Sequence, residues 1–258
     1  MNDAPNRSPL RRIPSADFLF AFIFLAALFH APVTAAETVR VEKVLDGDSL
    51  RLADGREVRL IGVNAPEFGK DGVPEEPLAR EARAALARLI HGEAVRLDSD
   101  IELKDRYGRT LAHVFLADGR NVEAALLRDG LVFHVAIAPN LARLDEYHAA
   151  EAEARRARRG VWGHAYYKPR EAAQSETQQG GFRFVEGRIQ RISRGPHAIY
   201  FDLTDSFTLV IPHEDWHLFG GDPKRLLHRR VIARGWVTVH ENRSRLRLSH
   251  PVMLEVVE

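Results

Sequence analysis

Cysteine is absent from this chain of 258 residues. Disulfide bonds, a thiol nucleophile and a thiolate zinc site are therefore excluded, and any catalytic role must fall to other side chains. The remaining composition is that of an ordinary globular protein, with 45% hydrophobic and 28% charged residues. A chain of this length is long enough for one or two domains with cores of their own.

A hydrophobic run long enough to span a membrane is also missing. The apolar run 18–29 has twelve residues, whereas a transmembrane helix needs about 20. Arg11 and Arg12 precede this run and the small residues 34–36 follow it. This order predicts a signal peptide over residues 1–36, with an uncleaved N-terminal anchor as the alternative. We therefore expect export to the periplasm or the medium, with no stable membrane association after cleavage.

An excess of charge of one sign is missing as well. Without residues 1–36 the chain carries 34 Lys and Arg against 34 Asp and Glu. No overall positive field would therefore attract a polyanion, so a nucleic-acid substrate would have to be bound by local arginines. The segment 182–258 is the basic part, with 12 basic and 9 acidic residues.

The pattern of apolar residues predicts a mainly β protein with helices (α+β). Alternation predicts strands, and apolar spacings of three and four predict helices. In the segment 37–166 the expected strands are 39–45, 49–53, 58–63, 93–97 and 109–116, and the expected helices are 78–90, 121–127 and 141–159.

The second half of the chain is predicted to be rich in strands. The segment 167–181 has no periodicity and is expected to be a linker. The β-rich runs after it predict a second small β-barrel of OB type over 182–258. These runs are 184–193, 198–204, 207–212, 229–240 and 245–257, with one short helix near 213–219.

Three segments of the first half carry the chemistry. The first is Asp46-Gly47-Asp48-Ser49, where two carboxylates can direct oxygens at a hard cation such as calcium. Taken alone, Asp-Gly is a common turn dipeptide. The second runs from Arg59 to Glu67, and the third is Asp105-Arg106-Tyr107-Gly108-Arg109. An arginine on a strand, or a glutamate after a proline, is by itself more often an ordinary surface residue.

In this order and spacing the three segments resemble the staphylococcal nuclease family. The resemblance covers roughly residues 38–163 and implies a five-stranded OB-fold barrel with three helices. It implies that Glu67 is the catalytic glutamate, that Arg59 and Arg109 clamp the phosphate, and that Asp48 binds the metal with Asp46 nearby. It also implies calcium-dependent cleavage of DNA and RNA that leaves 3′-phosphate ends.

These residue types suit phosphodiester hydrolysis. Charge develops on the non-bridging oxygens, and a guanidinium matches them because it is planar and always charged. A bound cation polarises the phosphoryl oxygen, and a carboxylate within reach of water can act as a general base. Arg106 and Tyr107 are candidate substrate contacts. We expect a monomeric nuclease that acts on DNA or RNA and needs no protein partner.

Two positions depart from the family pattern. Asn64 stands where family members usually have a second metal-binding aspartate, so the metal set becomes Asp48, Asp46, the Asn64 amide and the Ala65 carbonyl. Because ligand charge tunes calcium affinity, we expect weaker calcium binding. Residues 135–138 are aliphatic where relatives can stack an aromatic ring on a base. The alternative function is a nucleic-acid or protein-binding module that has lost turnover.

The second half contains one further motif, His213-Glu-Asp-Trp-His217, which matches the zinc-protease pattern H-E-x-x-H. That pattern needs a helix that presents both histidines on one face. Pro212 and Gly220 leave room for about two turns at most. A zinc site is therefore not expected here.

Overall fold

The computed structural model describes residues 36–257 except 70–71, 91, 93 and 175–179. The predicted signal peptide therefore lies, apart from Ala36, outside the described residues. Residues 34–258 form one compact unit. In the part of the chain that the structure describes, no helix has the length and apolar character needed to cross a membrane.

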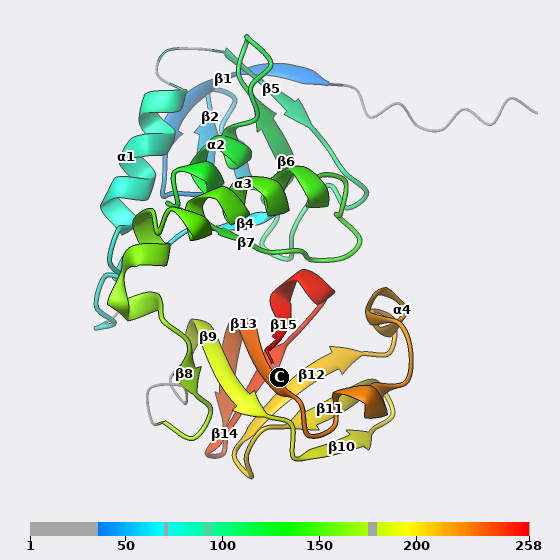
Figure 1. Cartoon of the computed structure of the whole chain (residues 1–258). Coiled ribbons are helices and arrows are strands. Elements are labelled where there is room, and N and C mark those ends of the chain that lie inside the picture. Colours follow the sequence, from blue (N-terminus) through cyan, green and yellow to red (C-terminus); the bar gives the residue numbers. More distant parts are fainter. Residues whose placement is uncertain (1–35, 70–71, 91, 93, 175–179, 258) are drawn as a thin grey trace, which may run out of the picture. The chain divides into compact units, whose positions relative to one another are not determined.

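The first half of the described chain forms a closed barrel with the strand order β1-β2-β3-β6-β5 (Figure 1). The β3–β6 pair is parallel and the other pairs are antiparallel. Alternate apolar side chains fill the barrel, so its strands follow the predicted alternation. The predicted five-stranded barrel is thereby confirmed. Its strands are β1 (Glu37–Val44), β2 (Ser49–Leu52), β3 (Glu57–Leu60), β5 (Ala94–Asp98) and β6 (Thr110–Phe115).

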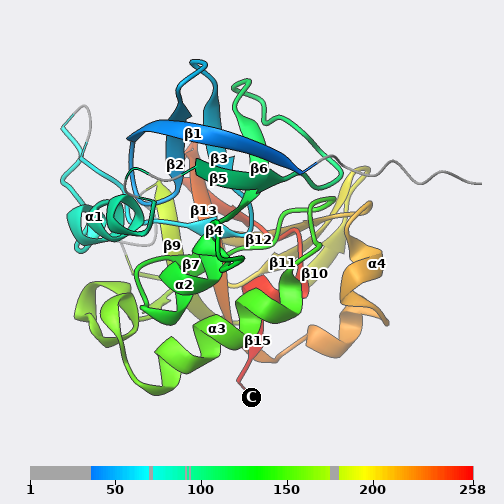
Figure 2. The same cartoon turned by 90° about the horizontal axis from the view of Figure 1, so that it is seen from above.

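Three helices gather along one side of the barrel strands, as Figure 2 shows. They are α1 (Ala79–Leu89), α2 (Val122–Arg128) and α3 (Leu144–Arg156). The predicted cap of α2 is present, because the Asn121 side chain accepts a hydrogen bond from the backbone N–H of Ala124. A two-stranded ladder of β4 (Val63–Asn64) and β7 (Phe133–His134) lies outside the barrel.

Helix α3 is shorter than the predicted 141–159. At its start, residues 142 and 143 form a turn before the helix, and the backbone N–H of Ala142 donates to the Asp100 carboxylate at 3.0 Å. At its end, Arg158 takes a left-handed conformation with a φ of 49°. Such a residue ends a helix because the following turn bonds back to the last carbonyls.

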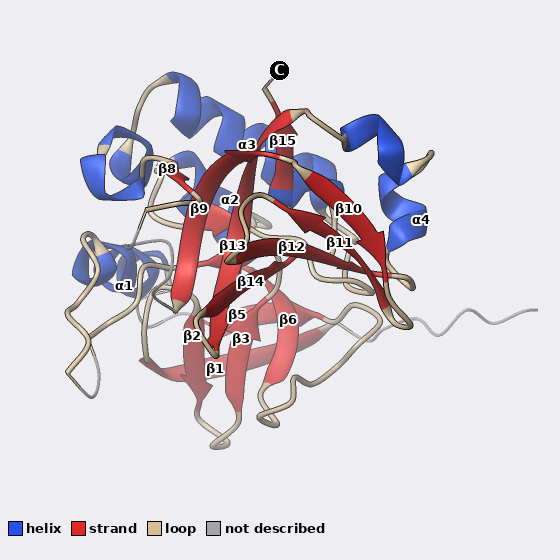
Figure 3. Cartoon of the chain, turned by 90° about the horizontal axis from the view of Figure 1, so that it is seen from below, coloured by secondary structure: helices blue, strands red, loops and turns tan. Residues whose placement is uncertain are grey.

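The second half forms one sheet in the order β10-β11-β12-β14-β13-β9-β8, with β15 paired to β13 (Figure 3). The expected second β-rich region is present. Within the described residues no ladder joins β10 to β8, so an open sheet stands where a closed barrel was expected. The strands are β8 (Arg170–Glu171), β9 (Gly181–Arg188), β10 (Arg191–Arg194), β11 (Ala198–Asp202), β12 (Phe207–Pro212), β13 (Arg230–His240), β14 (Arg243–Arg247) and β15 (Leu254–Val256).

Three boundaries in the second half differ from the predictions. The expected linker 167–181 contains β8, which pairs in parallel with β9. The expected strand 184–193 is two strands, β9 and β10. The expected strand 245–257 is interrupted by a 3-10 turn that begins at Pro251, because proline cannot donate to a ladder.

A third apolar cluster joins residues from both halves of the sequence. Phe133 of β7 stacks on Phe182 of β9, with ring centroids 5.2 Å apart. It also packs edge-on against Phe184 and Tyr167. The strands of the second sheet therefore bury apolar side chains of the first half, and the two halves share part of their core.

Candidate active site

The three chemistry-bearing segments meet at one end of three neighbouring barrel strands. Asp48 directly precedes β2, Arg59 lies on β3, and Arg109 directly precedes β6. In the register of the sheet, Ser49 pairs with Arg59 and Arg59 pairs with Leu111. The barrel thus brings together two arginines that are 50 positions apart in the sequence.

The turn before β2 holds Asp48 in place. The backbone N–H of Asp48 donates to Oδ1 of Asp46 at 2.9 Å. A Cβ added at Gly47 would lie 2.6 Å from the Cβ of Ala65 and 2.7 Å from that of Ala82. Glycine is therefore needed at position 47 so that the turn can approach α1 and the segment around Ala65.

Asp48 is buried and bonds to three different parts of the barrel. Its Oδ2 accepts the backbone N–H of Ala65 at 2.7 Å and lies 3.0 Å from Nη2 of Arg59. Its Oδ1 accepts the hydroxyl of Ser49 at 3.0 Å. Burial raises the pKa of Asp48 to about 7, against the lowering effect of Arg59, and the charge of Asp46 raises it further.

The guanidinium of Arg59 contacts three oxygen atoms. Nη1 donates to the carbonyl of Leu60 at 2.7 Å, and Nη2 reaches Oδ1 of Asn64 at 3.3 Å in addition to Asp48. The Asn64 amide in turn donates to the carbonyl of Ala65 at 3.2 Å. The planar fork of the guanidinium makes this three-way contact possible.

Arg109 is held by the tight turn that precedes β6. Asp105 accepts the side-chain Nε of Arg109 at 2.7 Å and its backbone N–H at 3.0 Å. Gly108, with a φ of 84°, allows the turn. The Nη1 atom of Arg109 lies 3.5 Å from the Ser49 hydroxyl, which links it to Asp48 and Arg59. The two predicted phosphate-binding arginines therefore belong to one polar network.

The Glu67 carboxylate is not hydrogen-bonded to this network, but the charges of the network act on it. Desolvation and the charge of Asp46 raise its pKa, while Arg59 and Arg109 lower it. Glu67 remains exposed to solvent, so water can reach its carboxylate. The structure therefore places Glu67 near both arginines without tying up its carboxylate.

The loop that carries Glu67 is closed by Glu76. The backbone N–H of Glu67 donates to Oε2 of Glu76 at 3.0 Å, and the backbone N–H of Glu76 donates to the carbonyl of Glu67 at 2.9 Å. The other carboxylate oxygen of Glu76, Oε1, lies 3.1 Å from Nη1 of Arg183 on β9. The second sheet thus contacts the segment that positions Glu67.

The two predicted substrate contacts, Arg106 and Tyr107, lie at the exposed tip of the turn. The Arg106 guanidinium donates to the Tyr107 hydroxyl at 2.7 Å and stacks over its ring. The Tyr107 side chain is 70% exposed, and Arg109 lies 5.7 Å from its ring centroid. Both residues are therefore free to meet a ligand that reaches Arg109.

The proposed metal donors suit a hard cation but are few. Asp46 lies close enough to Asp48 for its charge to raise the pKa of Asp48, and the Asn64 amide donates to the carbonyl of Ala65. Among the described residues, no group of three or more Asp, Glu, His or Cys side chains could hold a metal ion. Calcium takes six to eight oxygens, so water or substrate would have to complete the set.

The roles of three further residues were not predicted, although Ser49 and Asp105 stand in the segments singled out from the sequence. Ser49 bridges Asp48 and Arg109, Asp105 orients Arg109, and Glu76 anchors the Glu67 loop. The position of Asp105 four residues before Arg109 is a usable sequence signal for an ion pair across a turn. Glu76 carries no such signal, because its role depends on a loop closure and on a strand far along the chain.

The histidines of the H-E-x-x-H motif do not share a helix face. The helix α4 (Trp216–Phe219) begins after His213. His213 contacts the carbonyl of Gly195 at 2.9 Å, and His217 contacts that of Glu214 at 2.7 Å. Each of the two rings thus contacts a backbone carbonyl.

Comparison with known proteins identifies this arrangement. The family model described as staphylococcal nuclease homologue matches residues 57–164. The Thermonuclease of Staphylococcus hyicus is 34% identical over 129 residues, which cover 49% of this chain and 76% of that protein. The chain belongs to the staphylococcal nuclease family.

Further relatives match the same half of the chain. The Thermonuclease of Staphylococcus intermedius is 35% identical over 133 residues, 49% of this chain and 76% of the relative. Endonuclease YncB of Bacillus subtilis (strain 168) is 30% identical over 135 residues, 50% of this chain and 63% of the relative. The family model ends at residue 164, before β8 and the rest of the second sheet.

Proposed function

We propose that this member of the staphylococcal nuclease family hydrolyses phosphodiester bonds of DNA or RNA at the site formed by Arg59, Arg109, Glu67 and Asp48. The observation that carries the proposal is the polar network in which both guanidiniums reach the Asp48–Ser49 pair from neighbouring strands. The printed names of the relatives, Thermonuclease and Endonuclease, support the same reaction class.

The arginines bind and stabilise the phosphate. One edge of the Arg59 guanidinium is fixed by the carboxylate of Asp48, and one edge of the Arg109 guanidinium is fixed by that of Asp105. Their remaining N–H groups are oriented before substrate arrives, so little reorganisation is needed when charge develops on the phosphoryl oxygens. Glu67 accepts the proton of the attacking water as the general base, and its raised pKa brings it closer to neutral pH.

The metal proposed here is calcium, held by the carboxylates of Asp48 and Asp46 with the Asn64 amide and the Ala65 carbonyl. When bound, it would polarise a phosphoryl oxygen and neutralise charge. Its presence would also relieve the repulsion between Asp46 and Asp48 that raises the pKa of Asp48. Because Asn64 is uncharged, the affinity for calcium is expected to be low.

We also propose that residues 1–36 direct the chain to the periplasm or the medium, since they have the charge and length pattern of a signal peptide. The mass of the protein recovered after expression in a bacterium tests this. Loss of residues 1–35 or 1–36 is the expected result. A full-length protein in the membrane fraction would show an uncleaved anchor instead.

A cleavage assay tests the proposed function. The protein without residues 1–36 is incubated with single- and double-stranded DNA and RNA, with calcium or with a chelator, and the ends of the products are identified. Products with 3′-phosphate ends that form only with calcium are expected. Tight binding of nucleic acid without any cleavage would favour the alternative of a binding module that has lost turnover.

A further inference from the structure

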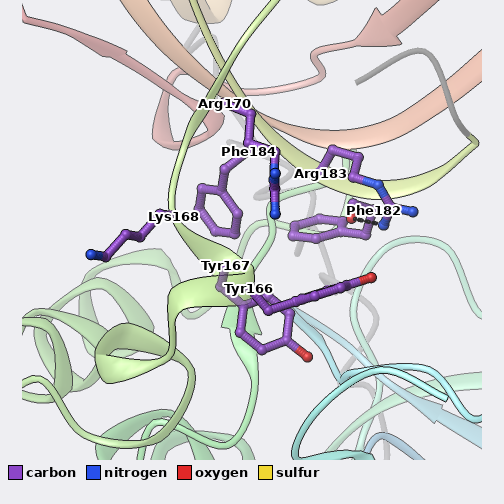
Figure 4. Close-up of a pocket in the computed structure, with 7 residues that line it drawn as sticks. All are labelled: Tyr166, Tyr167, Lys168, Arg170, Phe182, Arg183 and Phe184. Carbon is purple, nitrogen blue, oxygen red and sulfur yellow. Dashed lines mark hydrogen bonds between the residues drawn. The ribbon is translucent and has the colours of Figure 1, made fainter. Parts of the chain in front are cut away.

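A hollow of about 110 Å³ opens beside the loop that carries Glu67 (Figure 4). The Tyr166 hydroxyl on its rim lies 3.5 Å from Oε1 of Glu76. The other oxygen of Glu76 accepts the backbone N–H of Glu67 at 3.0 Å. The side chain of Glu76 therefore connects the rim of the hollow to the loop that carries Glu67. The hollow lies largely outside the part of the chain that the family model matches, because β9 forms one wall.

The inner wall of the hollow belongs to the shared core. Tyr167, Phe182 and Phe184 are buried and pack around Phe133. Their burial is explained by that packing alone. The rim is different, because its side chains contribute little to the core.

Tyr166 is the aromatic residue on the rim. Its ring packs edge-on against Tyr167 at 4.9 Å, yet the residue is 38% exposed. Within the described part of the chain, Tyr166 and Tyr107 are the two aromatic residues among the exposed large hydrophobics. Tyr107 lies beside Arg109 and Tyr166 beside the Glu67 loop, so both exposed rings border the candidate active site.

Three cationic residues complete the rim. Lys168 is exposed, and Arg183 is paired with Glu76. In Figure 4 the side chain of Arg170 runs toward the aromatic rings, whereas that of Lys168 extends away from them. Cations around an exposed ring are the combination that binds single-stranded nucleic acid, where bases stack and phosphates pair with Lys and Arg.

We propose that this hollow is a subsite for one nucleotide of a single-stranded nucleic acid, next to the nucleotides at the scissile bond. The base stacks on Tyr166, and its phosphate lies near Lys168. The base must be unpaired, because a paired base does not offer its face to a side chain. This inference rests on the proposed nuclease function. It would place part of the substrate grip on the second sheet, while residues 135–138 offer no aromatic ring.

Steady-state kinetics on two single-stranded substrates tests the subsite. A dinucleotide occupies the scissile bond alone, whereas a ten-nucleotide strand can also reach the hollow. The variant Tyr166→Leu/Lys168→Gln is expected to raise KM for the ten-nucleotide strand about tenfold, the effect of one lost base stack. Its kcat/KM for the dinucleotide should stay within about twofold of wild type, because the cleavage residues are unchanged.

Matched variants control for structure and charge. Tyr166→Phe keeps the ring and should keep the KM for the long strand. Lys224→Gln removes an exposed lysine in the 3-10 helix Pro223–Leu226 of the second half and should have no effect. An unchanged KM in the double variant would overturn the subsite while the nuclease function stands. An equal loss on both substrates would also overturn it, because Tyr166 would then act only by holding Glu76.

Binding separates this inference from the proposed function. If wild type cleaves neither substrate, the nuclease proposal fails, and fluorescence anisotropy with the labelled ten-nucleotide strand still decides the subsite. In the Glu67→Gln background, the added Tyr166→Leu change should weaken binding about tenfold, in line with the loss of one stacked base. Unchanged binding would contradict the subsite. Parallel DNA and RNA strands show which sugar is preferred.

Discussion

Asp48 is the side chain on which the candidate site converges. Its two oxygens contact Arg59, Ser49 and the backbone of Ala65, and Ser49 extends the network to Arg109. Asp48 is buried, and burying its negative charge would be costly without hydrogen-bond partners. These contacts provide such partners. The same carboxylate is the main candidate metal ligand, so phosphate binding and metal binding depend on one residue.

Asn64 stands where the resemblance to the family implies a second metal-binding aspartate. Its Oδ1 accepts from Arg59 and its amide donates to the Ala65 carbonyl. The variant Asn64→Asp would add a charged ligand and is expected to tighten calcium binding about tenfold, because ligand charge tunes calcium affinity. Calorimetry of calcium binding to both proteins measures this.

The calcium dissociation constant of the wild-type protein is equally informative. A dissociation constant in the low micromolar range for the unmodified protein would contradict the weak site inferred from Asn64. Asn140→Asp is a suitable control, since Asn140 bonds to the backbone of Glu102 and not to any candidate metal ligand. That change should leave calcium binding as it is.

At the scale of elements, β6 and α3 are joined by a buried histidine. His113 on β6 contacts the Tyr147 hydroxyl on α3 through Nδ1 at 2.7 Å. Burial lowers the pKa of His113 to about 4. The unfolded chain takes up this proton near the ordinary pKa of about 6.5. Stability from this residue is therefore complete above pH 6.5 and is lost as the pH falls toward 4.

A variant without this titration isolates the effect. The free energy of unfolding of wild type, minus that of His113→Gln, should fall by about 1.4 kcal/mol per pH unit between pH 6.5 and 4. Denaturant titrations at several pH values give this difference. A pH-independent difference for His113→Gln would show that the folded protein binds this proton normally.

Local patterns predicted most elements, because the relevant signals are local. The apolar spacing gave α1 within one residue of each end, and Asn121 marked the start of α2. The order of Asp48, Arg59, Glu67 and Arg109 indicated the site. The structure places these four residues in or beside one polar network.

The features that were missed depend on contacts between distant residues. The segment before α3 is bonded to Asp100, which is 42 positions before Ala142. The segment 167–181 lacks periodicity, yet β8 within it pairs with β9. Glu76 anchors Glu67 only because a loop closes and Arg183 arrives from the second sheet. No pattern in a single segment can report such pairings.

At the scale of the whole molecule, a buried ion pair joins α3 to the second sheet. Nη1 of Arg234 on β13 lies 2.8 and 2.7 Å from the two carboxylate oxygens of Glu151 on α3. Glu151 also accepts the backbone N–H of His134 at 2.8 Å. The pair therefore ties together a barrel helix, the β4–β7 ladder and β13.

Removing one partner would leave a buried charge alone. We expect Arg234→Ala to lower the free energy of unfolding by about 3–5 kcal/mol, as breaking buried ion pairs does. Denaturant unfolding measures the change. Arg191→Ala breaks an exposed pair with Asp202 on the same sheet and should cost about 1 kcal/mol or less. Equal losses in the two variants would show that the α3–β13 pair is no more than a surface contact.

The role of Glu67 offers the most direct measurement of the central claim. Glu67→Gln removes the base but keeps the size of the side chain, and its backbone bond to Glu76 remains. The kcat for cleavage of single-stranded DNA should fall by about 10²–10⁴, the usual worth of general acid–base catalysis, with an unchanged Tm. The control is Glu75→Gln in the same loop, where Glu75 pairs with Arg80 at the surface and activity should be retained. A Glu67→Gln protein that folds normally and cleaves at the wild-type rate would contradict the account.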